Sequence, residues 1–295
     1  LGGSSLTAVR LVHVLRDAVP GCEGLGLSDV FDHASVASMA SHVSSIGQGS
    51  DDGSSSSRVV RPRLLALTDD ERASLGLAAG VFPLSANQEQ MVILYSLDKQ
   101  SNVYNIPMEL TATGLLDEGA MRRCLAALVL RHASFRTVIA DDDATKQPMQ
   151  RVCDASDVDV MLEVMGADVV TADDGADSVS AFVQRVSDGV FDLYARPWIR
   201  FGLAHDAEHQ RSTLVISMHH IAGDGWCLQS LPSEVSAMYA AALAEPRMPA
   251  ESLSVLPSLP ELTVEYTDYA CWQRAWLAQV SETQLAYWRD QLGAS

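Results

Sequence analysis

The sequence predicts a mixed α/β domain preceded by a small all-α segment. Residues 5–45 carry apolar positions at helical spacing. Residues 47–63, GQGSDDGSSSSRVVRPR, are poor in apolar side chains and rich in Ser, Gly and Asp, which is typical of a flexible linker. From residue 65 onward, helical patterns alternate with the short apolar runs of strands. This order indicates a helical unit tethered to a larger α/β unit.

Composition narrows the classes of partner. The chain has 295 residues, a length that favours about two domains, and 47% of them are hydrophobic. Its 20 basic and 38 acidic side chains leave a net charge of −18, and no basic stripe stands out. Because an acidic surface repels phosphate, we do not expect a nucleic-acid partner. No apolar run approaches the ~18 residues of a membrane span, so a membrane partner is not expected either.

The cysteines indicate a reducing compartment. They are odd in number and include no CxxC pair: Cys22, Cys124, Cys153, Cys227 and Cys271. This spacing argues against a zinc site and against a disulfide framework, so no metal is expected. A cytoplasmic location is the corresponding expectation. The chain does not open with Met and LGGSSL lacks the pattern of a signal peptide, so we expect a piece of a longer protein.

Two helical patterns form the first unit. The first, SSLTAVRLVHVLRDA, places its apolar residues on one face, at Leu6, Val9, Val12 and Leu15. The second, LSDVFDHASVASMASHV, repeats the pattern after Ser28 and contains a short turn near Ala34 and Ser35. Fewer than 50 residues precede the linker, which is the size of a small tethered domain.

The larger unit mixes both periodicities. A helix is predicted over residues 116–135, a strand over 136–140, and a turn into a second strand after that. Residues 199–220 predict a hairpin of two strands around the turn DAEHQ. Residues 228–244 predict a helix with Pro232 near its first turn, where a missing N–H costs least.

Two adjacent histidines end this predicted hairpin. Because successive side chains of a strand point to opposite faces, His219 and His220 cannot both serve one site. His220 is nearer the following loop and is the better candidate for chemistry. Gly223 and Gly225 flank Asp224 in that loop and permit a positive φ or a close backbone approach. The Asp224 carboxylate either orients an imidazole or pairs with an arginine elsewhere; the alternative is that the segment is only a strand end and a turn.

The neighbouring residues resemble the condensation domain of nonribosomal peptide synthetases. HHIAGDG completes that family's HHxxxDG, and four further segments stand in the family's order: FPLSANQEQMVIL at 82–94, YNIP at 104–107, LRHASFRT at 130–137 and YTDYACWQ at 266–273. The resemblance implies a chloramphenicol-acetyltransferase-like fold. Residues 81–260 would form its N-terminal lobe and 261–295 the start of its C-terminal lobe, after a linker at 47–80.

The resemblance also implies roles for the site residues. His220 would be catalytic, while His219, Asp224 and Gly225 would support it. Arg136 sits where a helix gives way to a strand, so we expect it to be partly buried and to need a counter-charge. The family implies that Asp224 supplies that charge.

Two groups of aromatic and polar residues have more than one interpretation. Tyr266, Tyr269 and Trp272 recur every three residues and are interpreted as core side chains rather than ligand contacts.

The segment LGGSSLTAVRL resembles the attachment segment of a peptidyl carrier protein. The resemblance implies that residues 1–46 are such a carrier, truncated at its N-terminus and therefore an incomplete helical bundle. Ser5 would then carry 4′-phosphopantetheine; the alternative is that Ser5 only caps a helix.

The resemblance predicts formation of an amide bond by a carrier-bound acceptor amine attacking a carrier-bound aminoacyl or peptidyl thioester. The partners would be an upstream adenylation domain, a downstream carrier protein and a phosphopantetheinyl transferase. His220 would act as a general base or only position the amine. Two alternatives are a stand-alone acyltransferase using a soluble thioester and a non-catalytic docking platform. The piece by itself is expected to be weak or inactive.

Overall fold

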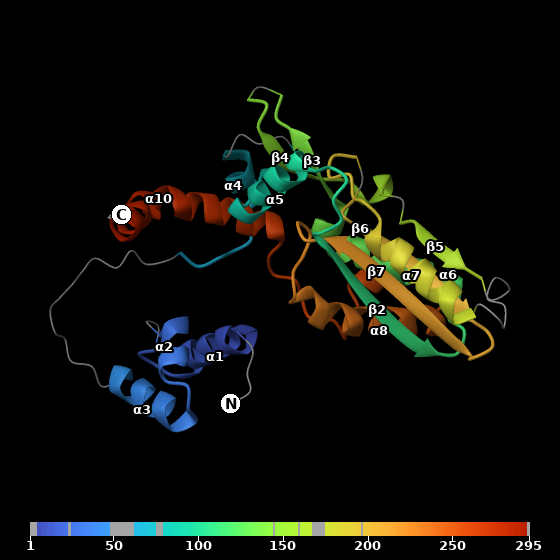
Figure 1. Ribbon diagram of the computed structural model, residues 1–295, viewed down its shortest axis with the longest axis horizontal. Helices are drawn as coiled ribbons and strands as arrows, with labels where there is room; N and C mark the ends of the chain where they lie inside the picture. The colour runs from blue at the N-terminus through green and yellow to red at the C-terminus, as the bar shows by residue number, and fades with distance from the viewer. Residues whose placement is uncertain are drawn as a thin grey trace. The chain divides into compact units, whose positions relative to one another are not determined.

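The computed structural model describes residues 5–22, 25–47, 62–74, 79–143, 145–158, 160–166, 175–195 and 197–293. The chain divides into two compact units, residues 1–60 and residues 61–295 (Figure 1).

The described part of the first unit consists of three helices. They are α1 (Ser5–Ala18), α2 (Leu27–Asp32) and α3 (Val36–Gly47), so the predicted helices and the predicted turn near residue 34 are confirmed. Val12, Leu25 and Met39 are buried between them. The helices also leave an apolar groove of about 880 Å³, which Leu11, Leu15 and Phe31 help to line.

A four-stranded sheet is the centre of the second unit. Its strand order is β2-β7-β6-β5, formed by Asn105–Thr113, Arg211–His219, Ile199–Asp206 and Leu162–Met165, respectively. The predicted hairpin is confirmed, because β6 and β7 pair antiparallel in a register that sets Ile199 opposite Met218. Strand β5 pairs parallel to β6, and the connection between them includes helix α7 (Gly175–Asp188).

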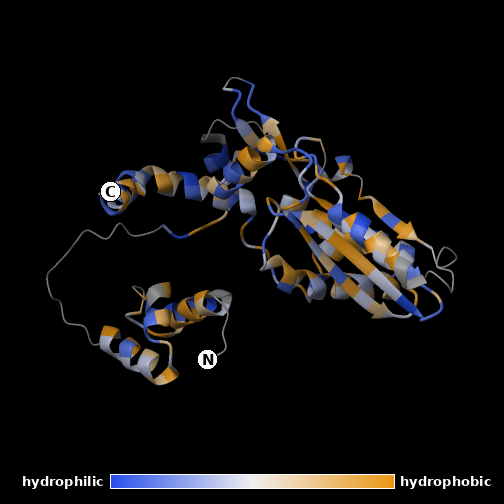
Figure 2. Cartoon of the chain, in the orientation of Figure 1, coloured by the Kyte–Doolittle hydropathy of each residue, from blue (hydrophilic) through white to orange (hydrophobic). Residues whose placement is uncertain are grey.

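Helices cover both faces of this sheet (Figure 1). Alternate residues of β7 enter different cores, because side chains of a strand alternate in direction. Leu214, Ile216 and Met218 join the larger core, to which α6 (Glu118–Arg131) and α8 (Cys227–Ala244) contribute. Val215 packs in a smaller core with residues of α7. Figure 2 shows hydrophobic residues along the strands of this sheet, and burial on both faces explains why the sequence of β7 is so apolar.

A second, smaller sheet adjoins the first. Its order is β1-β4-β3, with β1 at Val81–Pro83, β3 at Thr137–Asp141 and β4 at Pro148–Val152. The short 3-10 helix η1 (Ala133–Arg136) leads from α6 into β3, so the predicted helix-to-strand transition is confirmed. The remaining elements are α4 (Asp69–Ser74), α5 (Ala86–Leu97), η2 (Ala155–Asp157), α9 (Ala250–Ser254) and α10 (Tyr266–Leu292).

Two details differ from the sequence-based expectations. Pro232 lies inside α8 rather than in its first turn, because the helix begins at Cys227, in the loop after β7. Part of the segment expected as linker packs on the second unit: the backbone N–H of Leu67 donates to the Asp268 carboxylate at 3.1 Å, and Arg72 of α4 approaches the same carboxylate.

Candidate active site

Strand pairing continues through both histidines at the end of β7. The backbone N–H of His219 donates to the carbonyl of Trp198, just before β6, at 2.9 Å. The N–H of His220 donates in the opposite direction, to the carbonyl of Tyr104 just before β2, at 2.8 Å. The side chains therefore alternate as predicted: His219 is 5% exposed, whereas His220 is exposed.

His219 is a buried, neutral member of the core. Its Nδ1 accepts a hydrogen bond from the backbone N–H of Ile221 at 3.1 Å, which assigns the ring proton to Nε2. The rings of Tyr104 and Phe191 lie with their centroids 6.2 Å from the imidazole. Burial, and secondly the neighbouring His220, lower the pKa of His219 to about 4. At neutral pH this ring fixes the end of the strand and carries no charge.

His220 opens onto a pocket of about 490 Å³. The N-terminal part of α5, the turn between α6 and η1, the loop after β7 and residues 262–266 line this pocket. His132 and Tyr266 are among its polar lining residues, and Met91 and Ile221 are among its apolar ones. An exposed imidazole in a concave site is the arrangement that proton transfer or substrate positioning requires.

Asp224 holds the start of helix α8. Its carboxylate accepts a hydrogen bond from the backbone N–H of Trp226 at 2.9 Å, and its carbonyl accepts one from the N–H of Cys227 at 3.0 Å. The side chain itself is exposed. Asp224 thus shapes the loop between His220 and α8 through local backbone contacts.

Gly223 is needed for close packing rather than for its φ. A Cβ at this position would lie 2.7 Å from Sγ of Cys227 and 3.0 Å from Sδ of Met218. The expected close approach is therefore confirmed at Gly223. Gly223 and Gly225 both belong to the described residues and neither has a positive φ, so the expected left-handed conformation is not used in this loop.

The predicted ion pair between Arg136 and Asp224 is not formed in the described structure. Arg136 ends η1, and the pairing of β3 with β4 directs its guanidinium to the carbonyl of Cys153, 2.8 Å away. The Nε atom of Arg136 is buried without a hydrogen-bond partner among the described residues. The expectation that Arg136 is partly buried is confirmed, but its role here is to bind the backbone that follows β4.

Glu234 provides the buried counter-charge instead. It lies on α8 and is 5% exposed. One carboxylate oxygen lies 2.5 Å from Nε2 of His132 and the other lies 3.3 Å from Nε of Arg131. Burial acts to raise the pKa of this carboxyl, but His132 and Arg131 outweigh it and hold the pKa below its ordinary value. Sequence reasoning missed Glu234, although a glutamate beside Leu231 and Val235 on the buried side of a helix was an available signal.

Residues at the start of α10 form hydrogen bonds with the start of α5, beside the pocket. The Tyr266 and Ser85 hydroxyls lie 2.9 Å apart, and Gln273 accepts a hydrogen bond from the Ala86 N–H at 2.8 Å. Tyr266 lines the pocket of His220 and is partly buried, a position that its interpretation as a core side chain did not anticipate. Tyr269 and Trp272 stack with their centroids 5.9 Å apart and are partly buried, in keeping with a packing role.

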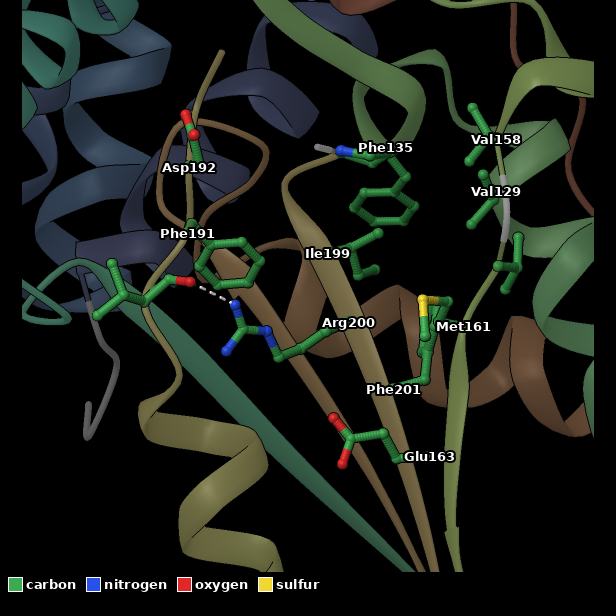
Figure 3. A pocket seen from close by; sticks show the side chains of 13 residues that line it. Val129, Phe135, Val158, Met161, Glu163, Phe191, Asp192, Ile199, Arg200 and Phe201 are labelled. Carbon is green, nitrogen blue, oxygen red and sulfur yellow. Dashed lines mark hydrogen bonds between the residues drawn. The ribbon is translucent and has the colours of Figure 1, made fainter. Parts of the chain in front are cut away.

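A second pocket, of about 420 Å³, lies between β5, β6 and the segment before β6 (Figure 3). The guanidinium of Arg200 stacks 4.1 Å from the centre of the Phe191 ring and donates to the Val190 carbonyl at 2.7 Å. Glu163 is paired with Arg185 at 2.5 Å. These charged groups are engaged within the chain, and the described lining of this pocket holds no imidazole, so the pocket of His220 is the better candidate for chemistry.

The predicted attachment serine falls at the edge of the described chain. Helix α1 begins at Ser5, while residues 1–4 and the Ser5 side chain lie outside the described residues. The first turn of a helix presents free N–H groups and a positive dipole end, which favour a phosphodiester. To this extent the local backbone fits a phosphopantetheine group on Ser5.

Membrane spans and metal clusters are both missing from the part of the chain that the structure describes. None of the described helices combines the length and the hydropathy that crossing a membrane requires. No group of three or more His, Cys, Asp or Glu side chains among the described residues is arranged to hold a metal ion.

The chain matches a known protein family over most of its length and known proteins over nearly all of it. The family described as the condensation domain matches residues 78–295. The chain is 29% identical over 299 residues to a linear gramicidin synthase of Brevibacillus parabrevis, with 100% of this chain and 3% of the relative covered. It is 32% identical over 299 residues to the dimodular nonribosomal peptide synthase of Bacillus subtilis (strain 168), with 99% and 11% covered. The chain thus spans a small part of the length of these relatives.

Solved structures share the fold of the second unit. The X-domain from teicoplanin biosynthesis has a TM-score of 0.59 at 22% identity, covering 78% of this chain and 45% of that one. The starter condensation domain of rhizomide synthetase has a TM-score of 0.58 at 19% identity, covering 72% and 48%. The predicted α/β fold of the chloramphenicol-acetyltransferase type is therefore confirmed at the level of the condensation domain.

Proposed function

Because the chain belongs to the condensation-domain family of nonribosomal peptide synthetases, we propose that it forms amide bonds as part of such a synthetase. The observation that carries this proposal is the contrast between the two histidines of HHxxxDG: His219 is sealed in the core and His220 opens into a pocket. The nucleophile is the amine of a carrier-bound acceptor, and the electrophile is a carrier-bound aminoacyl or peptidyl thioester.

The reaction needs one proton acceptor and a fixed geometry. The amine nitrogen forms a bond to the thioester carbon, the C–S bond breaks, and the thiol leaves with the proton that the nitrogen gives up. A free α-amine titrates near 8, so much of it is protonated at neutral pH. His220 takes a proton from the amine or orients it, and proximity in the pocket supplies a large part of the rate. The buried His219 and the Asp224 turn fix the backbone around His220.

The first unit is proposed to be the C-terminal part of a peptidyl carrier protein that delivers the donor on 4′-phosphopantetheine attached to Ser5. This prosthetic group supplies the thiol on which the acyl chain is held as a thioester. The start of α1 at Ser5 and the three-helix arrangement support the assignment. A phosphopantetheinyl transferase, an upstream adenylation domain and a downstream carrier protein are the partners that follow from it.

We place this activity in the intact synthetase and in the cytoplasm. The five cysteines are free thiols, which supports a reducing compartment. A stand-alone acyltransferase and a non-catalytic platform are less favoured, because the chain carries the HHxxxDG segment next to a pocket and matches long synthetases over its whole length.

The decisive experiment measures peptide transfer in the synthetase that contains this chain, by intact mass of the loaded downstream carrier. His220→Ala should lower the rate roughly 10²–10⁴-fold, the range for loss of a positioned proton acceptor. His209→Ala is the matched control, because His209 is an exposed histidine in the turn between β6 and β7. Full activity of the His220 variant would refute the proposal.

The carrier assignment has its own test. The chain is incubated with a phosphopantetheinyl transferase and coenzyme A and then weighed intact. We expect the mass of one phosphopantetheine to be added to the wild type and to Ser4→Ala, but not to Ser5→Ala. Absence of the gain in the wild type, or its survival in Ser5→Ala, would overturn the assignment.

A further inference from the structure

Glu265 stands at the wall of the His220 pocket, immediately before helix α10. Both polar groups of its backbone are hydrogen-bonded. The N–H donates to the Asp268 carboxylate at 2.9 Å, and the carbonyl accepts from the N–H groups of Asp268 at 3.1 Å and Tyr269 at 3.3 Å. These bonds fix the position of the residue without using its side chain.

The Glu265 carboxylate forms no ion pair with the described residues, and its side chain takes part in the capping box with Asp268 at the start of α10. The cations nearest to it are bound to other groups, although Nε of Arg136 is buried without a hydrogen-bond partner among the described residues. His132 is bound to Glu234, and Arg136 donates to the carbonyl of Cys153. Burial raises the pKa of Glu265, while His132, the Ala133 N–H and Arg136 act against that rise. The carboxylate is thus partly desolvated and incompletely neutralised.

The lining of the pocket has an acidic bias. It includes two carboxylates, those of Asp224 and Glu265, and no lysine or arginine among the described lining residues. The Asp224 carboxylate is engaged by the Trp226 N–H. Glu265 is therefore one of two anionic groups that a cationic substrate would meet in the pocket, and it is the more buried of the two. Charge-assisted hydrogen bonds to a carboxylate are the strong ones.

We propose that Glu265 binds the ammonium group of the acceptor substrate in the pocket of His220. This inference rests on the proposed function and adds a specificity-determining residue to it. The carboxylate accepts hydrogen bonds from the ammonium ion and stays ionised. When this is the α-ammonium group, one proton passes to His220 and the free amine nitrogen bonds to the thioester carbon. The C–S bond then breaks, and the sulfur leaves as the thiol with the second proton that the nitrogen gives up. The ammonium group of a basic acceptor side chain would bind Glu265 through the same hydrogen bonds, but it would stay protonated and take no part in the reaction.

The test uses the synthetase that contains this chain, with leucyl-pantetheine and lysyl-pantetheine thioesters as acceptor probes. We expect Glu265→Gln to raise the acceptor KM roughly 10–100-fold, the effect of losing a hydrogen bond to a charged group. The donor KM and the loading of the donor carrier should not change. Glu265→Asp, which keeps the charge, should recover part of the loss.

Two controls separate binding from folding. Glu261→Gln changes an exposed carboxylate close by in the chain and should behave as wild type. The midpoint of thermal unfolding of Glu265→Gln should stay at the wild-type value, because the backbone bonds of this residue remain.

The two probes identify the source of the ammonium group. A KM increase for both probes assigns Glu265 to the α-ammonium group, and an increase for the lysyl probe alone assigns it to the side chain. An acceptor KM equal to wild type for both probes overturns the inference while leaving amide formation intact. A wild-type synthetase that forms no amide with any acceptor would instead refute the proposed function.

Discussion

Nε2 of His132 lies 2.5 Å from a carboxylate oxygen of Glu234, and this contact ties the wall of the pocket to helix α8. His132 faces the pocket of His220, while Glu234 and its second partner Arg131 have side chains only 7% and 6% exposed. Helix α8 begins at the loop that follows His220. One buried carboxylate therefore holds two sides of the site together.

We expect Glu234→Gln to destabilise the chain by ~3–5 kcal/mol, because removing one member of a buried ion pair leaves its partners uncompensated. Asp224→Asn is the contrasting variant. Its side chain is exposed and bonded only to the Trp226 N–H among the described residues, so its effect should stay within about 0.5 kcal/mol. Chemical denaturation measures both. Equal losses in the two variants would contradict this assignment of the buried pair.

The ion pair of Glu234 should also make the free energy of unfolding depend on pH in the acidic range. Its pKa in the folded chain lies below the ordinary 4.5, so Glu234 adds stability above that value and loses it as pH falls through the folded pKa. The difference in unfolding free energy between wild type and Glu234→Gln should therefore shrink below pH 4.5. Urea denaturation across this range measures it, and a difference that grows in acid would show the sign to be wrong.

His219 should make the free energy of unfolding depend on pH in a second, higher range. Its folded pKa of about 4 lies below the ordinary 6.5, so the unfolded chain binds the proton first. Stability should fall progressively as pH drops from 6.5 toward 4, by a total of about 2–3 kcal/mol. His219→Gln should flatten this slope. NMR titration of the imidazole provides the direct check, and a midpoint at the ordinary value would rule out a buried neutral ring.

The packing at Gly223 can be tested by a double-mutant cycle. Gly223→Ala places a Cβ 2.7 Å from Sγ of Cys227, and we expect such overpacking to cost about 1–3 kcal/mol. Cys227→Ala removes the sulfur, so the same substitution should cost less in that background. Unfolding free energies of the four proteins give the coupling. Additive effects would mean that the loop relaxes freely around the new methyl group.

Local patterns were enough to predict the parts of the site that lie close together in the chain. Strand alternation separated the roles of His219 and His220, and the apolar runs around DAEHQ predicted the hairpin that carries them. These features depend on the periodicity of one segment, which follows from backbone geometry alone.

The partners of the charged groups could not be predicted in the same way. Arg136 and Asp224 were expected to pair, yet each binds nearby backbone instead. Glu234 instead meets His132 across 102 positions of sequence, and Glu265 reaches the pocket from the start of α10. Which carboxylate meets which cation depends on how helices such as α6 and α8 pack on each other in the core. Burial and distance set the strength of a charge interaction, and neither is encoded within a single segment.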